Sequence, residues 1–434
     1  SHRQVNLFFY CKAVAPKCFK SAFSTYSGII EFPAYLLLTI NNKHAFTRLL
    51  ISIEINIPNN QSDKLNKESF MLKKLDKLAS RGQSIWYDNI SRVLLDSGEM
   101  EKLIVNGVRG ITSNPSIFEN AIAKTTDYDK DILAAPKDAS AESVYESLVF
   151  SDIGRAADLL RPVYNGTLGK DGYISLEVSP ELAHNSDGTI EAARRYWQIV
   201  DRPNLMIKVP ATPDGISAIR QLVAEGINVN VTLLFSTTAY EMVAEAYIEG
   251  LEARLEAGFD ISDVHSVASF FVSRVDTVID NQLDAMNKPA LKGKAGISNA
   301  KIAYGKFQKI FNSPRWEKLV RAGANVQRPL WASTGTKNPD YPDTLYVDNL
   351  IGPDTVNTAP PKTYEAFIDH GKVDTTVVAV QRAGIEMGIL KAAGISIEDV
   401  TDQLLTEGVQ KFAKAFTSLL ASVDKKRNIL AATD

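Results

Sequence analysis

The chain has 434 residues, of which 45% are hydrophobic and 23% are charged, a composition typical of a soluble globular protein rather than a disordered one. At roughly 150 residues per domain, this length predicts two or three domains or one large barrel. The net charge of −3 provides no overall basic field that would attract nucleic acid or an anionic membrane. No apolar run approaches the ~20 residues that span a bilayer. We therefore expect neither a nucleic-acid partner nor a membrane partner.

Residues 1–60 differ from the rest of the chain in charge. They carry six Lys or Arg against two Glu, a net charge of +4, whereas the remaining residues hold 42 basic and 49 acidic side chains, a net charge of −7. Both cysteines, Cys11 and Cys18, lie in this segment, and Met71 is the first methionine. The rest of the chain therefore has no disulfide scaffold, no cysteine nucleophile and no thiolate metal site.

Three interpretations of this leading segment stay open. It is an acid-poor transit peptide, or it is part of a truncated precursor. In the third interpretation the natural protein starts at Met71, and the residues before it come from translating the nucleotide sequence upstream of the start codon. We expect residues 1–70 to be a poorly structured extension and residues 71–434 to be a single catalytic domain. The compartment, cytoplasm or plastid stroma, depends on which interpretation holds.

From Ser84 onward, short apolar and β-branched runs alternate with longer amphipathic stretches, which is typical of βαβ units and a parallel sheet. The predicted strands are Ser84–Asp88, Val108–Thr112, Tyr173–Val178, Leu205–Pro210, Asn228–Phe235, His265–Val272, Pro329–Ser333 and Thr344–Asn349.

The intervening segments have helical periodicity. Thr189–Val200 and Ala239–Ala257 are predicted helices, and the tail from Val373 to Leu430 predicts two or three more. Eight such units over roughly 350 residues predict a (β/α)₈ barrel with extra C-terminal helices. A doubly wound open sheet is the alternative, but it would normally carry a glycine-rich phosphate loop after its first strand, and the sequence contains no such loop.

Single polar residues stand at the ends of these apolar strands, where the active site of such a barrel lies. Asp88 ends the first strand, Glu177 lies in the third, Lys208 lies in the fourth, Arg274 follows the sixth and Lys337 follows the seventh. Each alone has an ordinary explanation, such as an edge residue, a helix cap or a surface ion pair. Their joint placement predicts a site, because unpaired buried charge is costly.

These residue types indicate carbonyl chemistry. Burial disfavours the charged form of a lysine, so Lys208 could supply a free amine that forms a Schiff base with a carbonyl. Asp88 and Glu177 could move the protons that C–C cleavage and loss of water require. Arg274 and Lys337 could clamp a phosphate. The three histidines after residue 70 form no predicted ligand cluster, so we expect no metal and no cofactor.

Five segments resemble transaldolase signatures and occur in the order of that family. The branch that they resemble is the plant and cyanobacterial one, and the similarity covers about residues 70–434. The segments are residues 110–118, 175–178, 206–212, 228–235 and 268–274. The resemblance implies a class I aldolase-type (β/α)₈ barrel of the pentose phosphate pathway, with sugar phosphates as substrates, and it leaves a monomer and a homodimer open.

The resemblance also implies roles for individual residues. By motif position Lys208 matches the Schiff-base lysine, Asp88 the acid/base of C–C cleavage and Glu177 the carboxylate that activates water, with Thr232 helping to hold that water. Further positions match substrate contacts, and Lys337 stands in for an absent second phosphate arginine. Phe271 occupies a position where fructose 6-phosphate aldolases carry tyrosine, which favours transfer over simple cleavage. The implied substrate-binding residues are Asn114, Asn230, Ser269, Phe271, Arg274, Ser333 and Lys337.

The implied reaction moves a dihydroxyacetone unit from sedoheptulose 7-phosphate to glyceraldehyde 3-phosphate. The alternatives are a class I aldolase that releases free dihydroxyacetone and a non-catalytic barrel that binds sugar phosphates.

Overall fold

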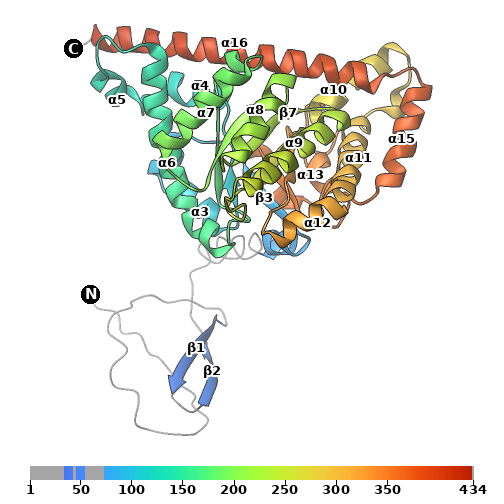
Figure 1. Ribbon diagram of the computed structural model, residues 1–434, viewed down its shortest axis with the longest axis horizontal. Coiled ribbons are helices and arrows are strands. Elements are labelled where there is room, and N and C mark those ends of the chain that lie inside the picture. The colour runs from blue at the N-terminus through green and yellow to red at the C-terminus, as the bar shows by residue number, and fades with distance from the viewer. Residues whose placement is uncertain (1–33, 43–44, 54–72, 433–434) are drawn as a thin grey trace. The chain divides into compact units, whose positions relative to one another are not determined.

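The computed structural model describes residues 34–42, 45–53 and 73–432 (Figure 1). The chain divides into two units, residues 1–70 and 71–434. In the first unit, strands β1 (Ala34–Asn42) and β2 (Ala45–Ile53) pair as an antiparallel hairpin. The other residues of that unit, including Cys11 and Cys18, lie outside the described residues, so the expectation of a poorly structured extension over residues 1–70 stays a prediction.

The second unit is built on a closed barrel of eight parallel strands, in the order β10-β3-β4-β5-β6-β7-β8-β9. Nearly every strand residue is buried, because helices cover the outside and side chains fill the inside. The predicted (β/α)₈ barrel is confirmed. The strands are β3 (Gln83–Tyr87), β4 (Gly110–Ile111), β5 (Tyr173–Glu177), β6 (Leu205–Pro210), β7 (Val229–Leu234), β8 (Ser266–Phe271), β9 (Arg328–Ala332) and β10 (Thr355–Ala359).

The eighth predicted strand, Thr344–Asn349, is wrong. Residues Leu345–Asn349 form the short helix α13, and strand β10 begins eleven residues after the predicted start, at Thr355. The first of these segments is rich in apolar and aromatic residues and therefore resembles a strand, whereas β10 contains two threonines and an asparagine that face other polar groups. The other seven predicted strands overlap observed ones.

Helices surround the barrel, and the predicted helices Thr189–Val200 and Ala239–Ala257 fall in α7 and α9. The helices preceding the C-terminal pair are α2 (Arg92–Asp96), α3 (Glu99–Val105), α4 (Pro115–Ala123), α5 (Asp129–Ala134), α6 (Ala141–Gly166), α7 (Ser186–Val200), α8 (Pro213–Ala224), α9 (Thr237–Glu256), α10 (Ser273–Ala285), α11 (Ala295–Ile310), α12 (Pro314–Arg321), α13 and α14 (Pro361–His370), with short 3₁₀ turns at Pro180–Leu182 and Pro289–Leu291.

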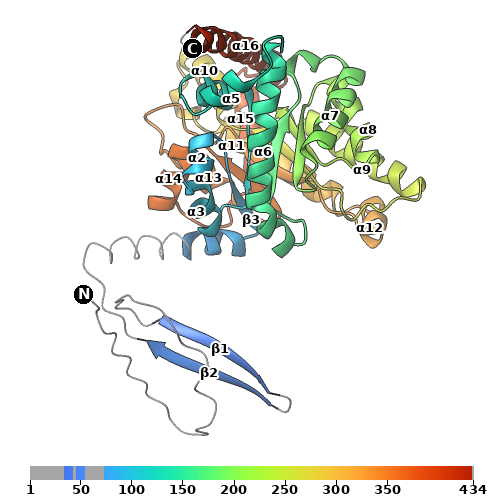
Figure 2. The same ribbon diagram turned by 90° about the vertical axis from the view of Figure 1, so that its left-hand side faces the viewer.

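The C-terminal tail forms two helices, α15 (Val380–Ala392) and α16 (Ile397–Ala431). Figures 1 and 2 show α16, 35 residues long, lying across one end of the barrel. It contacts β7, α4, α5, α6 and α10. It therefore covers the end at which the polar side chains gather. No helix among the described residues is long and apolar enough to cross a membrane.

The opposite end of the barrel is closed by a buried ion pair. Arg328 Nη1 lies 3.0 Å from Asp171 Oδ1, and Arg328 Nη2 donates to Ser84 Oγ at 2.7 Å. Asp171 also accepts hydrogen bonds from Ser84 Oγ at 2.6 Å and from Trp86 Nε1 at 3.1 Å. The guanidinium and the carboxylate at this end are thus paired with each other and with neighbouring polar groups, although Arg328 Nε has no hydrogen-bond partner among the described residues.

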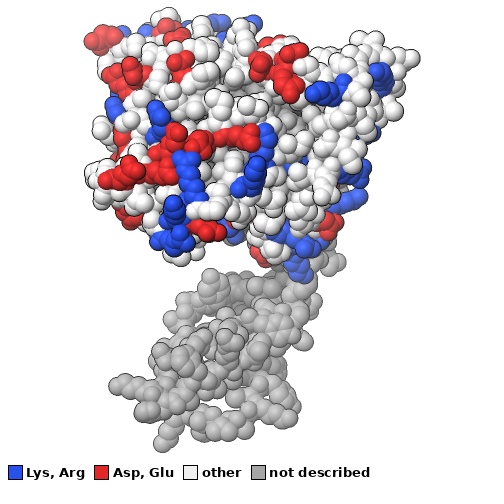
Figure 3. All heavy atoms as spheres, turned by 45° about the vertical axis from the view of Figure 1, so that its right-hand side comes forward, with Lys and Arg blue, Asp and Glu red and all other residues white. Residues whose placement is uncertain are grey.

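On the outer face drawn in Figure 3, acidic and basic side chains lie side by side. The acidic residues of α9 form exposed ion pairs with neighbouring helices. Glu241 pairs with Lys306, and Glu245 and Glu252 pair with Arg315. These glutamates form a solvated face of α9.

Candidate active site

Lys208 lies inside the barrel at the C-terminal end of β6. The residue is only 5% exposed. Its Nζ donates to the Ser113 carbonyl oxygen at 3.1 Å and lies 3.5 Å from Glu177 Oε2. In the register of the parallel strands Lys208 pairs with Glu177 on β5 and with Asn230 on β7. Three adjacent strands thus present these polar side chains at one level of the barrel.

Two carboxyl groups flank this lysine. Burial raises the pKa of Asp88 above its usual range, opposed by the charge of Lys208, by a hydrogen bond from Thr112 and by the charges of Lys337 and Arg274. Burial likewise raises the pKa of Glu177, opposed mainly by Lys208. Raised pKa values suit carboxyl groups that take up and release protons near neutral pH.

Asp88 is held by a chain of hydroxyl groups. Thr112 Oγ1 donates to Asp88 Oδ1 at 2.7 Å and lies 2.6 Å from Thr358 Oγ1 on β10. Because β10 was placed wrongly from the sequence, Thr358 was missed as a neighbour of the site.

A second hydrogen-bond chain is centred on Asn230, the neighbour of Lys208 on β7. Asn230 Nδ2 donates to Ser175 Oγ at 2.8 Å, and Ser269 Oγ donates to Asn230 Oδ1 at 2.7 Å. Two residues further along the same two strands stand Glu177 on β5 and Thr232 on β7. The Thr232 side chain is fully buried, and its Oγ1 has no hydrogen-bond partner among the described residues.

Asn114 caps a helix and also lies at the site. Its Oδ1 accepts a hydrogen bond from the Ile117 amide at 3.1 Å and caps α4, while Pro115 occupies the first turn. The local sequence therefore predicts a helix start, and the side chain amide nitrogen is left to contact other groups.

Two cations without carboxylate partners stand at the same end of the barrel. Among the described residues, neither Arg274 nor Lys337 forms an ion pair or a hydrogen bond with another side chain. Arg274 is half-buried and lies over the Phe271 ring, 5.0 Å from Cζ to the centroid, whereas Lys337 is exposed. Burial lowers the pKa of Arg274, and nearby Glu177 and Asp88 oppose this change.

Ser333 lies beside Arg274 at the end of β9. It has a positive φ of 54°, its carbonyl oxygen accepts from the Ser273 amide at 3.1 Å, and the two hydroxyl oxygens lie 2.9 Å apart. Ser273, which the sequence did not single out, thus adds a hydroxyl next to the unpaired arginine.

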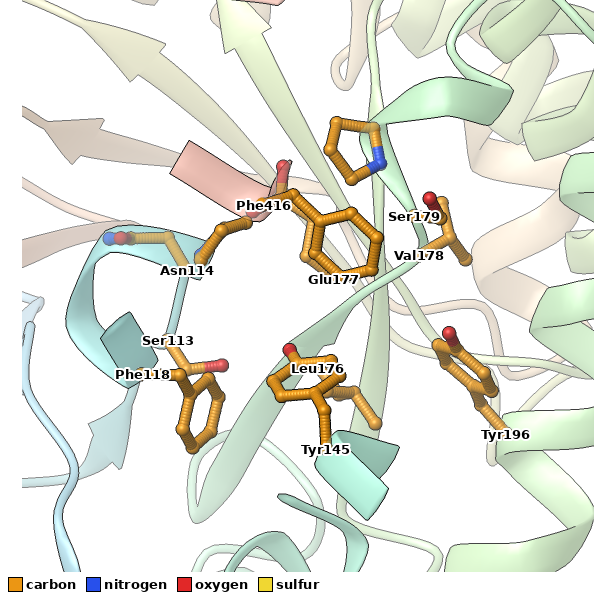
Figure 4. A pocket seen from close by; sticks show the side chains of 12 residues that line it. Ser113, Asn114, Phe118, Tyr145, Leu176, Glu177, Val178, Ser179, Tyr196 and Phe416 are labelled. Carbon is orange, nitrogen blue, oxygen red and sulfur yellow. The ribbon is translucent and has the colours of Figure 1, made fainter. Parts of the chain in front are cut away.

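A small cavity of about 10 Å³ lies beside Glu177, near the lower limit for one water molecule. Figure 4 shows Tyr145, Tyr196 and Phe416 around it, together with Asn114 from the start of α4. Phe416 comes from α16, so this helix takes part in enclosing the carboxylate.

The structure brings the predicted residues to one end of the barrel. Lys208, Glu177, Asn230, Thr232, Ser269 and Phe271 lie on the strands, and Asp88, Asn114, Arg274, Ser333 and Lys337 lie just beyond strand ends. Phe412, also from α16, was missed because its spacing is that of an ordinary buried helix residue. Within the described part of the chain, no group of three or more His, Cys, Asp or Glu side chains could hold a metal ion.

Comparison with known proteins identifies the same family that the motifs suggested. Residues 85–423 match the Transaldolase/Fructose-6-phosphate aldolase family. A transaldolase of Trichodesmium erythraeum is 50% identical over 366 residues, which cover 81% of this chain and 96% of that protein. Transaldolase 2 of Nostoc sp. (strain PCC 7120) is 49% identical over 367 residues, with the same coverage. A transaldolase of Mycolicibacterium smegmatis is 48% identical over 354 residues, 80% of this chain and 95% of that protein.

The first two of these organisms are cyanobacteria, which fits the branch that the motifs resemble. The match includes all the strands of the barrel after the first few residues of β3, and it includes most of α16. The chain is an enzyme of the transferase class and belongs to the transaldolase/fructose-6-phosphate aldolase family.

Proposed function

We propose that the chain transfers a dihydroxyacetone unit from sedoheptulose 7-phosphate to glyceraldehyde 3-phosphate, as a step of the pentose phosphate pathway. The reaction runs through a Schiff base on Lys208 and uses no metal. The observation that supports this most directly is the placement of Lys208, buried in the barrel with Nζ between the Ser113 carbonyl oxygen and the Glu177 carboxylate.

The reaction begins when the neutral amine of Lys208 attacks the C2 carbonyl of the donor. The resulting carbinolamine loses water, and Glu177 delivers the proton that lets the hydroxyl leave. Asp88 then accepts the C4 hydroxyl proton while the C3–C4 bond breaks and its electron pair moves toward the iminium nitrogen. Erythrose 4-phosphate departs, and an enamine remains on the lysine.

The second half of the reaction reverses these steps with a new aldehyde. The enamine carbon attacks the carbonyl carbon of glyceraldehyde 3-phosphate, and Asp88 returns its proton to the new alkoxide. Water then adds to the iminium with the help of Glu177 and Thr232, and fructose 6-phosphate leaves. The raised pKa values of Asp88 and Glu177 suit this exchange, because each group both donates and accepts a proton.

The remaining residues bind the substrate in this proposal. Arg274 and Lys337 neutralise the phosphate, and their lack of carboxylate partners among the described residues supports this role. Ser333 adds a hydroxyl donor next to them. The donor hydroxyls contact Asn114 and Asn230, while Ser269 orients Asn230 through its 2.7 Å hydrogen bond.

The test is to reduce the protein with borohydride in the presence of fructose 6-phosphate and to map the adduct by peptide mass spectrometry. We expect modification of Lys208 in the wild type and none in Lys208→Met, which should also lose turnover. Lys170→Met, an exposed lysine in an ion pair, is the matched control. An unmodified Lys208, or turnover retained in Lys208→Met, would contradict the proposal.

A class I aldolase that releases free dihydroxyacetone is the second candidate, because the matching family includes fructose-6-phosphate aldolases. The two activities separate when fructose 6-phosphate is supplied with and without erythrose 4-phosphate as acceptor. Transfer requires the acceptor, whereas cleavage that proceeds equally well without it would identify an aldolase.

A further inference from the structure

Helix α16 presents one continuous buried stripe to the barrel. The stripe runs from Val400 to Val423, and its central members are Gly408, Phe412 and Phe416, which are four residues apart and so lie on one face. Figures 1 and 2 show this helix across the end of the barrel. The middle of α16 therefore lies over the site, and its ends lie over the surrounding helices.

Gly408 lies where α16 packs closely against the end of β7. A Cβ placed on Gly408 would lie 3.0 Å from Leu233 Cδ2. Leu233 has a positive φ of 58° and lies at the register shift between β7 and β8. Because a larger residue would push against Leu233, glycine lets the helix sit close to the strand end and sets the position of the next turn.

That next turn carries Phe412 to the reactive lysine. Phe412 is 6% exposed, and its ring centroid lies 6.0 Å from Lys208 Nζ and 5.8 Å from Arg274 Cζ. One aromatic ring thus lies near both the amine and the unpaired cation. It places an apolar surface over Nζ on the side that faces α16.

This position bears on the fate of the fragment held by the lysine. In the proposed reaction the enamine either attacks an aldehyde, which is transfer, or takes a proton on carbon to become an iminium. Water then adds to the iminium carbon, the C–N bond breaks with its electron pair going to nitrogen, and free dihydroxyacetone leaves. Both routes end with water adding to an iminium on the lysine, but only the second requires solvent to reach and protonate the enamine in place of an acceptor aldehyde. An apolar ring over Nζ hinders that access.

We propose that Phe412 is a specificity-determining residue that favours transfer over hydrolysis by keeping solvent away from the enamine bound to Lys208 until an acceptor aldehyde arrives. This inference rests on the proposed function, since it presupposes a fragment on that lysine. It assigns α16 a part in the reaction that lies beyond covering the barrel.

The test measures the rate of dihydroxyacetone release from fructose 6-phosphate without acceptor, divided by the rate of transfer with acceptor. Phe412→Ala opens the space, and Phe412→Gln keeps a side chain of moderate size that is polar. We expect both to raise the ratio about tenfold or more. Phe412→Leu, which keeps an apolar cover, should stay within about threefold of the wild type.

Leu419→Ala is the matched control, because Leu419 is fully buried on the same helix face but lies two turns, about 10 Å, further along α16 than Phe412. It should lower the unfolding temperature and leave the ratio unchanged. The proposal is wrong if Phe412→Ala and Phe412→Gln keep the wild-type ratio, if Phe412→Leu behaves like Phe412→Gln, or if Leu419→Ala raises the ratio as much as Phe412→Ala does.

Borohydride labelling of the wild-type protein distinguishes a failure of this inference from a failure of the proposed function. If borohydride labels Lys208 in the wild type while the ratio does not respond to Phe412, only the role of Phe412 fails. If Lys208 is never labelled, the proposed function fails and the role of Phe412 fails with it.

Discussion

Thr232 shows how a single buried hydroxyl can indicate a functional role. Its Oγ1 is buried on β7 without a hydrogen-bond partner among the described residues. A buried unsatisfied hydroxyl costs about 1–3 kcal/mol of stability, so an apolar residue would serve the fold better at this position. The hydroxyl is therefore explained more readily by a water molecule or a substrate atom than by packing.

Thr232→Val keeps the shape of the side chain and removes the hydroxyl. We expect a thermal unfolding temperature equal to or above that of the wild type, because no hydrogen bond within the described protein is lost. We also expect kcat to fall about tenfold, since proton transfers of this kind contribute roughly 10²–10⁴-fold and Glu177 remains in place. Differential scanning calorimetry and steady-state kinetics check the two parts. A variant that is less stable but fully active would indicate a structural hydroxyl instead.

At the scale of single elements, apolar strand patterns were enough to predict most of the barrel. Seven strands lie in mainly apolar segments because both of their faces are buried, and the sequence predicts them within a few residues. The eighth strand fails this pattern. Asn357 and Thr358 on β10 are buried. Asn357 accepts a hydrogen bond from Thr334, and the Thr358 hydroxyl is hydrogen-bonded to that of Thr112, so this strand is polar inside the barrel.

The candidate site was predictable where one polar residue interrupts an apolar strand. Lys208 and Glu177 stand out for this reason. Phe412 could not be found in the same way, since an aromatic residue in a helical stripe looks like any other core residue until the helix is placed over the barrel. Thr358 was not predicted because its strand was placed elsewhere in the sequence. Ser273 was not predicted because no sequence pattern distinguishes it from other serines.

Helix α10, whose second residue is Arg274, contains a buried carboxyl group that makes a pH prediction possible. Burial raises the pKa of Asp276 to about 7, and nearby Asp280 adds to the effect, while the Gly296 amide donates to Asp276 Oδ1 at 2.8 Å and opposes it. Between the usual aspartate pKa near 3.8 and this value, the folded protein binds a proton that the unfolded chain has released. Stability is therefore lost as pH rises through this window.

Asp276→Asn removes this titration. We expect the free energy of unfolding of the wild type to fall by up to about 1.4 kcal/mol for each pH unit between pH 4 and pH 7, relative to the variant. Urea unfolding across that range measures the difference. Asp284→Asn, at an exposed residue paired with Lys292, is the control; it keeps Asp276, so its stability should change with pH in the same way as that of the wild type. A difference between Asp276→Asn and wild type that does not depend on pH would refute the prediction.

At the scale of the whole barrel, the two ends differ in whether their arginine has a carboxylate partner. At the N-terminal end Arg328 is 5% exposed and is bonded to Asp171, Ser84 and the Thr355 carbonyl oxygen. At the C-terminal end Arg274 has no carboxylate partner among the described residues. A barrel of this kind places stabilising interactions at the first end and reacting groups at the second.

This contrast predicts that Arg328→Met lowers stability and leaves the chemistry intact. The change strands Asp171 as a buried charge, which costs roughly 3–5 kcal/mol. Urea unfolding should show this loss, while kcat and KM of the folded fraction at low temperature stay within about twofold of the wild type. Arg315→Met removes an exposed arginine that pairs with Glu245 and Glu252, and it should cost less than about 1 kcal/mol. Equal losses in the two variants would show that the buried pair contributes no more than a surface pair, and a large fall in kcat for Arg328→Met would show that the two ends of the barrel are coupled.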